Sequence, residues 1–236
     1  MIRSTVQSRA GIRRTAARVA WLALFATLAA CSQSATTKPG TGGASGAPAG
    51  GIAGCPSSAP AKAAAGSTAT ATIETPKGTI VIKLEADLGP AAVGNFIALA
   101  KCGYYDGVVF HRLVPGFVIQ GGDGQYGRQG TVNASRIGNG GPGYTIDDDP
   151  VTATYGRAVV AMARTPNPHS QGSQFFIVLN DAARTSLAGA NTYAIMGHVT
   201  SGMEVVDTMA AMPNAGGDSN AAIDPVPMTH VTIGAP

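Results

Sequence analysis

The chain has 236 residues, of which 44% are hydrophobic and 12% are charged, and its formal net charge at pH 7 is +3. Five arginines precede residue 19, and without them the count is 11 basic against 13 acidic residues, a net charge near −2. Nucleic-acid binding therefore has no compositional support, because the remainder of the chain carries no excess of cations.

Residues 1–31 have the pattern of a bacterial export signal. The five arginines form a basic region without an acidic residue, and an apolar stretch of 12 residues follows from Val19 to Ala30. Such a stretch is too short to span a bilayer as a stable helix. It ends in Leu-Ala-Ala-Cys31, which resembles a lipobox, so Cys31 is predicted to be lipidated after cleavage. An ordinary secretory signal stays open, as does the choice between Sec and twin-arginine export through Arg13-Arg14.

The composition changes again after the signal. Residues 32–68 are nearly all Ser, Thr, Gly, Ala and Pro. This mixture buries too little apolar surface to offset the entropy of ordering, so a flexible tether is predicted there. Residues 69–236 then suffice for one domain. The sequence thus predicts a domain outside the cytoplasm, lipid-anchored to a bacterial membrane, and leaves inner and outer membranes undecided.

Two cysteines, Cys55 in the tether and Cys102 at the end of a predicted helix, remain once Cys31 is lipidated. Outside the cytoplasm such a pair can form a disulfide, which would fasten the end of the tether to the domain. Two free thiols are the alternative, and the sequence does not decide between them.

The sequence of the domain predicts mainly short strands. Period-two alternation with a Pro-Lys-Gly turn predicts a hairpin over residues 70–85, and Pro90 opens a helix that Gly103 ends. Residues 121–157 are rich in glycine and polar groups and are expected to be mostly loop. A second short helix is expected over 202–211. Further strands are predicted at 108–113, 117–120, 158–163, 175–179, 193–199 and 226–234.

The run FHRLVPGFVIQGGD, residues 110–123, is the most informative motif. It places a lone cation, Arg112, in an apolar stretch with Phe117 and Gln120 close behind. A cation with no acid, base or nucleophile nearby suits a reaction that needs only polarisation and shape. The run matches the cyclophilin signature almost letter for letter, so the chain resembles a bacterial cyclophilin-type peptidyl-prolyl cis-trans isomerase.

The resemblance implies a role for each residue of this run. Arg112 would donate a hydrogen bond to the prolyl nitrogen, Phe117 would form a wall of the proline pocket, and Gln120 would hold Arg112 or the substrate backbone. Val118 stands where many members have methionine. His111 alternates to the face opposite Arg112 in a regular strand, so we interpret it as a structural residue.

A second block, VVAMARTPNPHSQGSQFFIV at residues 159–178, resembles the family's other strong motif. The resemblance implies that the backbone of Ala163 and Arg164 meets the peptide in a strand-like manner. Gln174 and Phe176 alternate and so share a face. Phe176 would form the floor of the pocket, and Gln174 would lie at the neighbouring subsite.

The third block departs from the family pattern. Leu187 matches, but Ser186 replaces a common tryptophan, and Tyr193 stands where a histidine is expected. The only tryptophan, Trp21, lies in the signal. Activity is expected to survive, with Tyr193 capping the pocket. Cyclosporin is expected to bind weakly, because the indole contributes much to that complex in the family.

The predicted fold class is mainly β, a closed eight-stranded antiparallel barrel capped by two α-helices. Periodicity alone does not separate a barrel from a sandwich; the resemblance does. Proline-containing polypeptides are the expected partners of a monomer that needs no cofactor or metal, and Asp147 to Asp149 lack the spacing of a calcium loop and are interpreted as solvated. The alternative function is a non-catalytic module or holdase that binds proline peptides.

Overall fold

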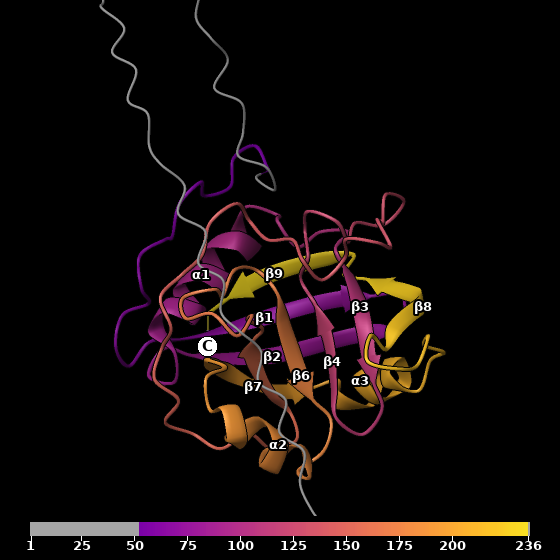
Figure 1. Ribbon diagram of the computed structural model, residues 1–236. Helices are drawn as coiled ribbons and strands as arrows, with labels where there is room; N and C mark the ends of the chain where they lie inside the picture. Colours follow the sequence, from indigo (N-terminus) through magenta and orange to yellow (C-terminus); the bar gives the residue numbers. More distant parts are fainter. Residues whose placement is uncertain (1–51, 236) are drawn as a thin grey trace, which may run out of the picture. The chain divides into compact units, whose positions relative to one another are not determined.

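The computed structural model describes residues 52–235, so the predicted signal, Cys31 and the first part of the tether lie outside the described residues. Within that range the chain forms nine strands and three helices (Figure 1). The strands are β1 (Thr68–Thr75), β2 (Gly78–Glu85), β3 (Val109–Val114), β4 (Val118–Gly121), β5 (Val159–Met162), β6 (Phe175–Val178), β7 (Ile195–Ser201), β8 (Ala221–Pro227) and β9 (His230–Gly234). The helices are α1 (Pro90–Lys101), α2 (Ala183–Ala190) and α3 (Met203–Ala210). No helix in the described part of the chain is long and apolar enough to cross a membrane.

The strands form one curled sheet in the order β8-β3-β4-β6-β5-β7-β2-β1-β9, and neighbouring strands pair in antiparallel fashion. The prediction of a closed eight-stranded barrel was wrong, because β8 and β9 are sheet edges that no ladder joins within residues 52–235. The strand expected at residues 226–234 is interrupted at Met228-Thr229. The amide of Met228 donates to the carbonyl of Val108, and the amide of Thr229 donates to the carbonyl of Glu74. The two halves of that strand therefore pair with different strands, β3 and β1.

The helices occupy separate places around the sheet. α1 contacts β2, β7 and β9, whereas α3 contacts β2, β3 and β4, and Figure 1 places these two helices at opposite ends of the sheet. The expected count of two helices was wrong, because α2 forms between β6 and β7 in a segment whose short length and polar residues gave little helical periodicity.

The start of α1 explains the last of the three consecutive aspartates, Asp149. Its N-cap, Gly89, has no side chain to bond the free amides of the first turn. The carboxylate of Asp149 accepts hydrogen bonds from the amides of Ala91 (3.1 Å) and Ala92 (2.8 Å) instead. Asp149 is 5% exposed, and Asp148 is also bonded within the fold. The interpretation of this acidic run as solvated loop was therefore wrong for Asp148 and Asp149.

Alternation along the strands creates two separate apolar clusters. In β6, Phe175 and Ile177 belong to the main core inside the curl, while Phe176 and Val178 belong to a smaller cluster on the outer face. Leu187 of α2 packs into that smaller cluster. The helix that the sequence did not predict thus covers the outer face of the sheet, next to the predicted site.

The chain before β1 packs onto α1. The amide of Ala63 donates to the carbonyl of Pro90 (2.9 Å), and a Cβ at Gly94 would collide with the carbonyl oxygen of Ala61. Ile52 and Cys55 pack against the main core. We call residues 52–67 the strap. The predicted tether reaches residue 68, but its last part is ordered against the domain.

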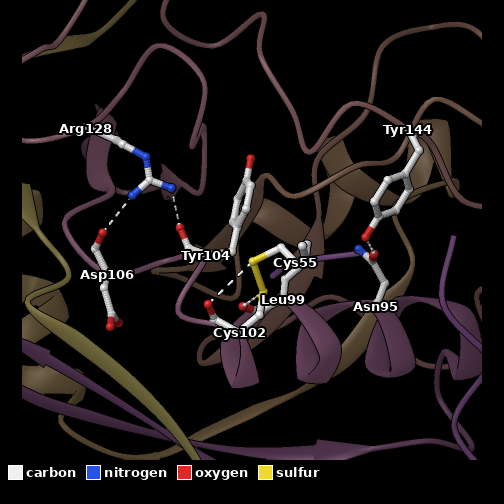
Figure 2. Close-up of a disulfide and its surroundings, with 8 residues drawn as sticks. All are labelled: Cys55, Asn95, Leu99, Cys102, Tyr104, Asp106, Arg128 and Tyr144. Atoms are coloured by element: carbon white, nitrogen blue, oxygen red, sulfur yellow. Dashed lines mark hydrogen bonds between the residues drawn. A yellow bond between two sulfur atoms is a disulfide. The ribbon is translucent and has the colours of Figure 1, made fainter. Parts of the chain in front are cut away.

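A disulfide between Cys55 and Cys102 fastens the strap to the end of α1 (Figure 2). The sequence left this bridge and two free thiols open, and the structure contains the bridge. The turn that follows Cys102 carries Tyr104, whose hydroxyl is hydrogen-bonded to that of Ser173 at 2.9 Å, and Arg128 donates to the carbonyls of Tyr104 and Asp106.

Candidate active site

Cross-strand pairing aligns three of the predicted site residues on the outer face of the sheet. Arg112 of β3 pairs with Gln120 of β4, and Gln120 pairs in turn with Phe176 of β6. Residues that pair directly across antiparallel strands point to the same face. Phe110 and Leu113 both belong to the main core, because the register of β3 shifts between Phe110 and Arg112. The regular alternation expected at His111 is therefore interrupted, although His111 is buried. The register therefore presents a cation, an amide and an aromatic ring in one row.

This row borders a cavity of about 280 Å³. The lining residues come from four regions that are distant in sequence: the β3–β4 hairpin, the end of β5, β6, and the segment from α2 to β7. The lining consists of Arg112, Phe117, Val118, Gln120, Ala163, Arg164, Phe176, Leu187 and Tyr193. The structure thus brings together every predicted pocket residue except Gln174.

Aromatic packing forms one wall of this cavity, which we call the Arg112 cavity. The ring of Tyr193 meets that of Phe176 edge-on, with centroids 5.4 Å apart, and meets Tyr155 at 6.4 Å. The hydroxyl of Tyr155 donates to the carbonyl of Tyr193 (2.9 Å), and burial raises the pKa of Tyr155 to about 12. Tyr155 therefore stays protonated and fixes the backbone of Tyr193.

The guanidinium of Arg112 differs from that of Arg164, the other arginine in the lining. Among the described residues Arg112 has no hydrogen bond or ion pair, whereas Arg164 donates to three carbonyl oxygens. Arg112 is partly exposed and faces the apolar lining. Its donors are therefore available to a bound molecule.

Gln120 does not hold Arg112. Its side-chain amide donates to the side-chain oxygen of Gln174 (2.9 Å). Gln174 in turn donates to the carbonyls of Gly138 and Gly140, both at 2.9 Å. The two glutamines are thus oriented by the loop between β4 and β5, a contact that the strand pattern did not indicate.

A second cavity of about 500 Å³ lies beside the first and contains Gln174 in its lining. Gln120, Ala163 and Arg164 line both cavities. Most of the remaining lining belongs to the glycine-rich loop, which the sequence indicated only as irregular. That part consists of Gln125, Gly138, Asn139, Gly140, Gly141, Gly143, Tyr144 and Thr145.

The glycine-rich loop is held by a buried carboxylate that the sequence did not single out. Asp123 is fully buried, and its oxygens accept hydrogen bonds from the amides of Gln125, Tyr126, Gly138 and Gly140. Two segments of the loop, residues 125–126 and 138–140, are thereby held against this carboxylate. The signal that could have indicated Asp123 is the position of an acidic residue two places after the apolar strand β4.

The chemistry available in the Arg112 cavity is limited. Its titratable lining residues are Arg112, Arg164 and Tyr193, so the cavity wall presents no carboxylate, imidazole, thiol or aliphatic hydroxyl. A nucleophile paired with a general base, which covalent catalysis requires, is therefore missing from this wall. An apolar cavity with one free donor group suits a reaction that changes the shape and charge distribution of a bound group.

Comparison with known families agrees with this geometry. A family model described as cyclophilin type peptidyl-prolyl cis-trans isomerase/CLD matches residues 70–233. The chain belongs to the cyclophilin family. Its curated relatives carry the corresponding activity in their names, and this cyclophilin is accordingly a peptidyl-prolyl cis-trans isomerase. The match begins two residues inside β1, so the strap lies before it.

Several bacterial relatives resemble this cyclophilin over most of their length. A probable peptidyl-prolyl cis-trans isomerase of Brucella suis is 33% identical over 168 residues, covering 70% of this chain and 83% of the relative. A peptidyl-prolyl cis-trans isomerase of Streptomyces antibioticus is 33% identical over 171 residues and is covered to 98%. A crystal structure of a cyclophilin from Cryptosporidium parvum is 28% identical, with a TM-score of 0.59 over 72% of this chain and 99% of that one.

His111 precedes Arg112 on β3 of this cyclophilin and is 5% exposed. Burial lowers its pKa from 6.5 to about 4, although the charge of Asp123 opposes the shift. Below pH 6.5 the unfolded chain binds a proton at this position and the folded chain does not. Stability is therefore lost as the pH falls from about 6.5 to 4, by roughly 3 kcal/mol in free energy of unfolding.

Replacing His111 with glutamine is expected to reduce the loss of stability between pH 6.5 and 4. The measurement is the free energy of unfolding at a series of pH values, compared between parent and variant between pH 6.5 and 4. The control His230→Gln removes a half-exposed histidine and should lose as much stability as the parent between pH 6.5 and 4. An equal loss of stability in His111→Gln and the parent over this range would contradict the assignment.

Proposed function

We propose that Arg112 is the catalytic donor of this isomerase and that its substrates are X-Pro bonds in exported or unfolded proteins. The observation that carries the proposal is the unbonded guanidinium of Arg112 at the edge of an apolar cavity lined by Phe117, Phe176 and Leu187. The function rests on shape and on one charge, without a covalent step.

The chemistry of the X-Pro bond explains why this combination suffices. The partial double bond gives a rotation barrier of about 18–20 kcal/mol, and the uncatalysed reaction takes tens of seconds or longer. A donor that bonds the prolyl nitrogen as it becomes pyramidal weakens the resonance. The interaction is stronger in the twisted transition state than in either ground state, which is the condition for catalysis.

Arginine suits this role for two reasons. Its guanidinium stays protonated at any working pH, and its planar fork can bond a nitrogen and a neighbouring carbonyl oxygen together. The apolar wall of Phe117, Phe176 and Tyr193 would hold the proline ring while the flanking carbonyl turns. A crystal structure of the Cryptosporidium parvum cyclophilin, solved in the presence of the dipeptide Ala-Pro, supports a proline-sized ligand for this fold.

The direct test is NMR exchange spectroscopy on a short proline peptide with the purified protein. Catalysis predicts exchange between cis and trans peptide at a rate that rises with protein concentration. The alternative, a binding module or holdase, predicts broadened peptide signals without faster exchange. Cyclosporin should inhibit only at concentrations far above that of the enzyme, because position 186 on α2 carries an exposed serine.

We also propose that the protein is a lipoprotein whose domain works outside the cytoplasm. The support is the sequence pattern that ends in Cys31, together with a disulfide, which persists in oxidising compartments. In a bacterial host, labelled palmitate should enter the full chain and not the Cys31→Ala variant, and only the full chain should fractionate with membranes. Labelling of both proteins, or of neither, would contradict lipidation at Cys31.

A further inference from the structure

Arg164 lines both cavities, and its guanidinium is hydrogen-bonded to backbone carbonyls. Its side chain is 7% exposed. The guanidinium donates to the carbonyls of Thr165 (3.1 Å), Thr192 (3.3 Å) and Asn167 (2.8 Å). These bonds tie the loop after β5 to the residue that precedes Tyr193, which lines the Arg112 cavity.

Asp148 neutralises this cation. One carboxylate oxygen of Asp148 lies 3.1 Å from the guanidinium of Arg164 and also accepts the amide of His169 (2.9 Å). The other oxygen accepts the side-chain amide of Gln171 (2.8 Å). The side chain of Asp148 is 22% exposed, and both of its carboxylate oxygens have partners within residues 164–171.

We propose that Asp148 is a specificity-determining residue, which masks the charge of Arg164 so that peptides are accepted regardless of an acidic residue beside the X-Pro pair. This inference rests on the proposed function, because it concerns peptides bound across the two cavities. Gln120, Ala163 and Arg164 line both cavities, so a peptide with its proline beside Arg112 passes Arg164 on its way to the second cavity.

The consequence follows from the other lining residues. Apart from Arg112 and Arg164, the side chains that line the two cavities are neutral. While Asp148 is ionised, a substrate carboxylate near Arg164 meets a compensated charge. Without Asp148 the same carboxylate would meet an uncompensated guanidinium in a partly desolvated place, where opposite charges attract more strongly than in water. The chain would then favour acidic peptides.

The test compares Asp148→Asn with the parent on matched proline peptides. The peptides carry Glu or Gln either directly before the X-Pro pair or directly after the proline, and kcat/KM is measured for each. The parent should treat Glu and Gln alike within about twofold. Asp148→Asn should raise the Glu/Gln ratio about fivefold on the flank that crosses into the second cavity, and 0.5 M salt should largely abolish the rise.

Asp147→Asn is the matched control, because the neighbouring carboxylate is 72% exposed and carries the same charge without contacting Arg164. It should leave the ratio unchanged. The double variant Asp148→Asn/Arg164→Met should return the ratio to that of the parent. Thermal melting shows whether each variant folds. If Asp148→Asn does not fold, Asp148→Glu, which keeps the charge, should keep the Glu/Gln ratio of the parent. Arg164→Met alone should not lower that ratio.

The outcomes separate the two proposals. A parent without isomerase activity would overturn the proposed function. An active parent with no change of ratio in Asp148→Asn, on either flank, would overturn only the masking of Arg164. An equal rise in Asp147→Asn would also overturn it, since the effect would then reflect net charge alone. A Glu/Gln ratio that falls in Arg164→Met would mean that the guanidinium already engages acidic substrates.

Discussion

Arg112→Ala is expected to lower kcat/KM for a proline peptide by about two to three orders of magnitude, the range seen when one preorganised donor to a transition state is removed. Arg112 has no partner within the described part of the chain, so its loss should leave the stability of the fold nearly unchanged. The cavity wall of Phe117, Phe176 and Tyr193 would remain, and peptide affinity should fall much less than the rate.

The measurement is NMR exchange or a protease-coupled assay, with peptide affinity determined in parallel. Lys101→Ala, which removes an exposed cation at the end of α1, is the charge-matched control and should retain full activity. Arg112→Lys should recover only part of the rate, because an ammonium lacks the planar fork. Equal rates for Arg112→Ala and the parent would refute the catalytic assignment.

Among the variants considered, removal of the disulfide is expected to lower the free energy of unfolding most. The bridge closes a loop with a sequence separation of 47, for which the chain-entropy model gives a stabilisation of about 4 kcal/mol. The double variant Cys55→Ser/Cys102→Ser should therefore unfold at a markedly lower denaturant concentration than the parent. The Arg112 cavity has no lining residue in the strap, so activity at moderate temperature should persist.

A reducing agent provides the internal control for this prediction. It should lower the unfolding midpoint of the parent to that of the double variant and leave the double variant itself unchanged. A parent whose midpoint is insensitive to reduction would contradict a stabilising role for the bridge, and a double variant without activity would show that the strap supports the site.

The resemblance to the cyclophilin signature predicted Arg112, Gln120 and Phe176 as residues of one pocket. They lie on the adjacent strands β3, β4 and β6, and the pairing of Arg112 with Gln120 and of Gln120 with Phe176 places them on one face. The hairpin of β1 and β2, helix α1 with its proline start, and helix α3 were also predicted, because each has a local pattern and a local stop signal.

The features that were not predicted depend on contacts between distant residues. Asp149 caps a helix that begins 59 positions earlier, and Asp148 meets a cation 16 positions later. A run of three acidic residues gives no local sign of either partner. The division between β8 and β9 was missed for a similar reason, since Met228 and Thr229 turn the strand toward partners near Val108 and Glu74.

The disulfide of Figure 2 also decides how the domain would respond to tension. A pull on the chain before Cys55 reaches the fold through the sulfur of Cys102, at the end of α1. The hairpin of β1 and β2 lies inside the covalent loop that the bridge closes, and no load passes along it. Force applied through the N-terminal side would therefore act on the end of α1 and not on β1. The strands of the sheet that carries Arg112 would then not be separated one after another from β1.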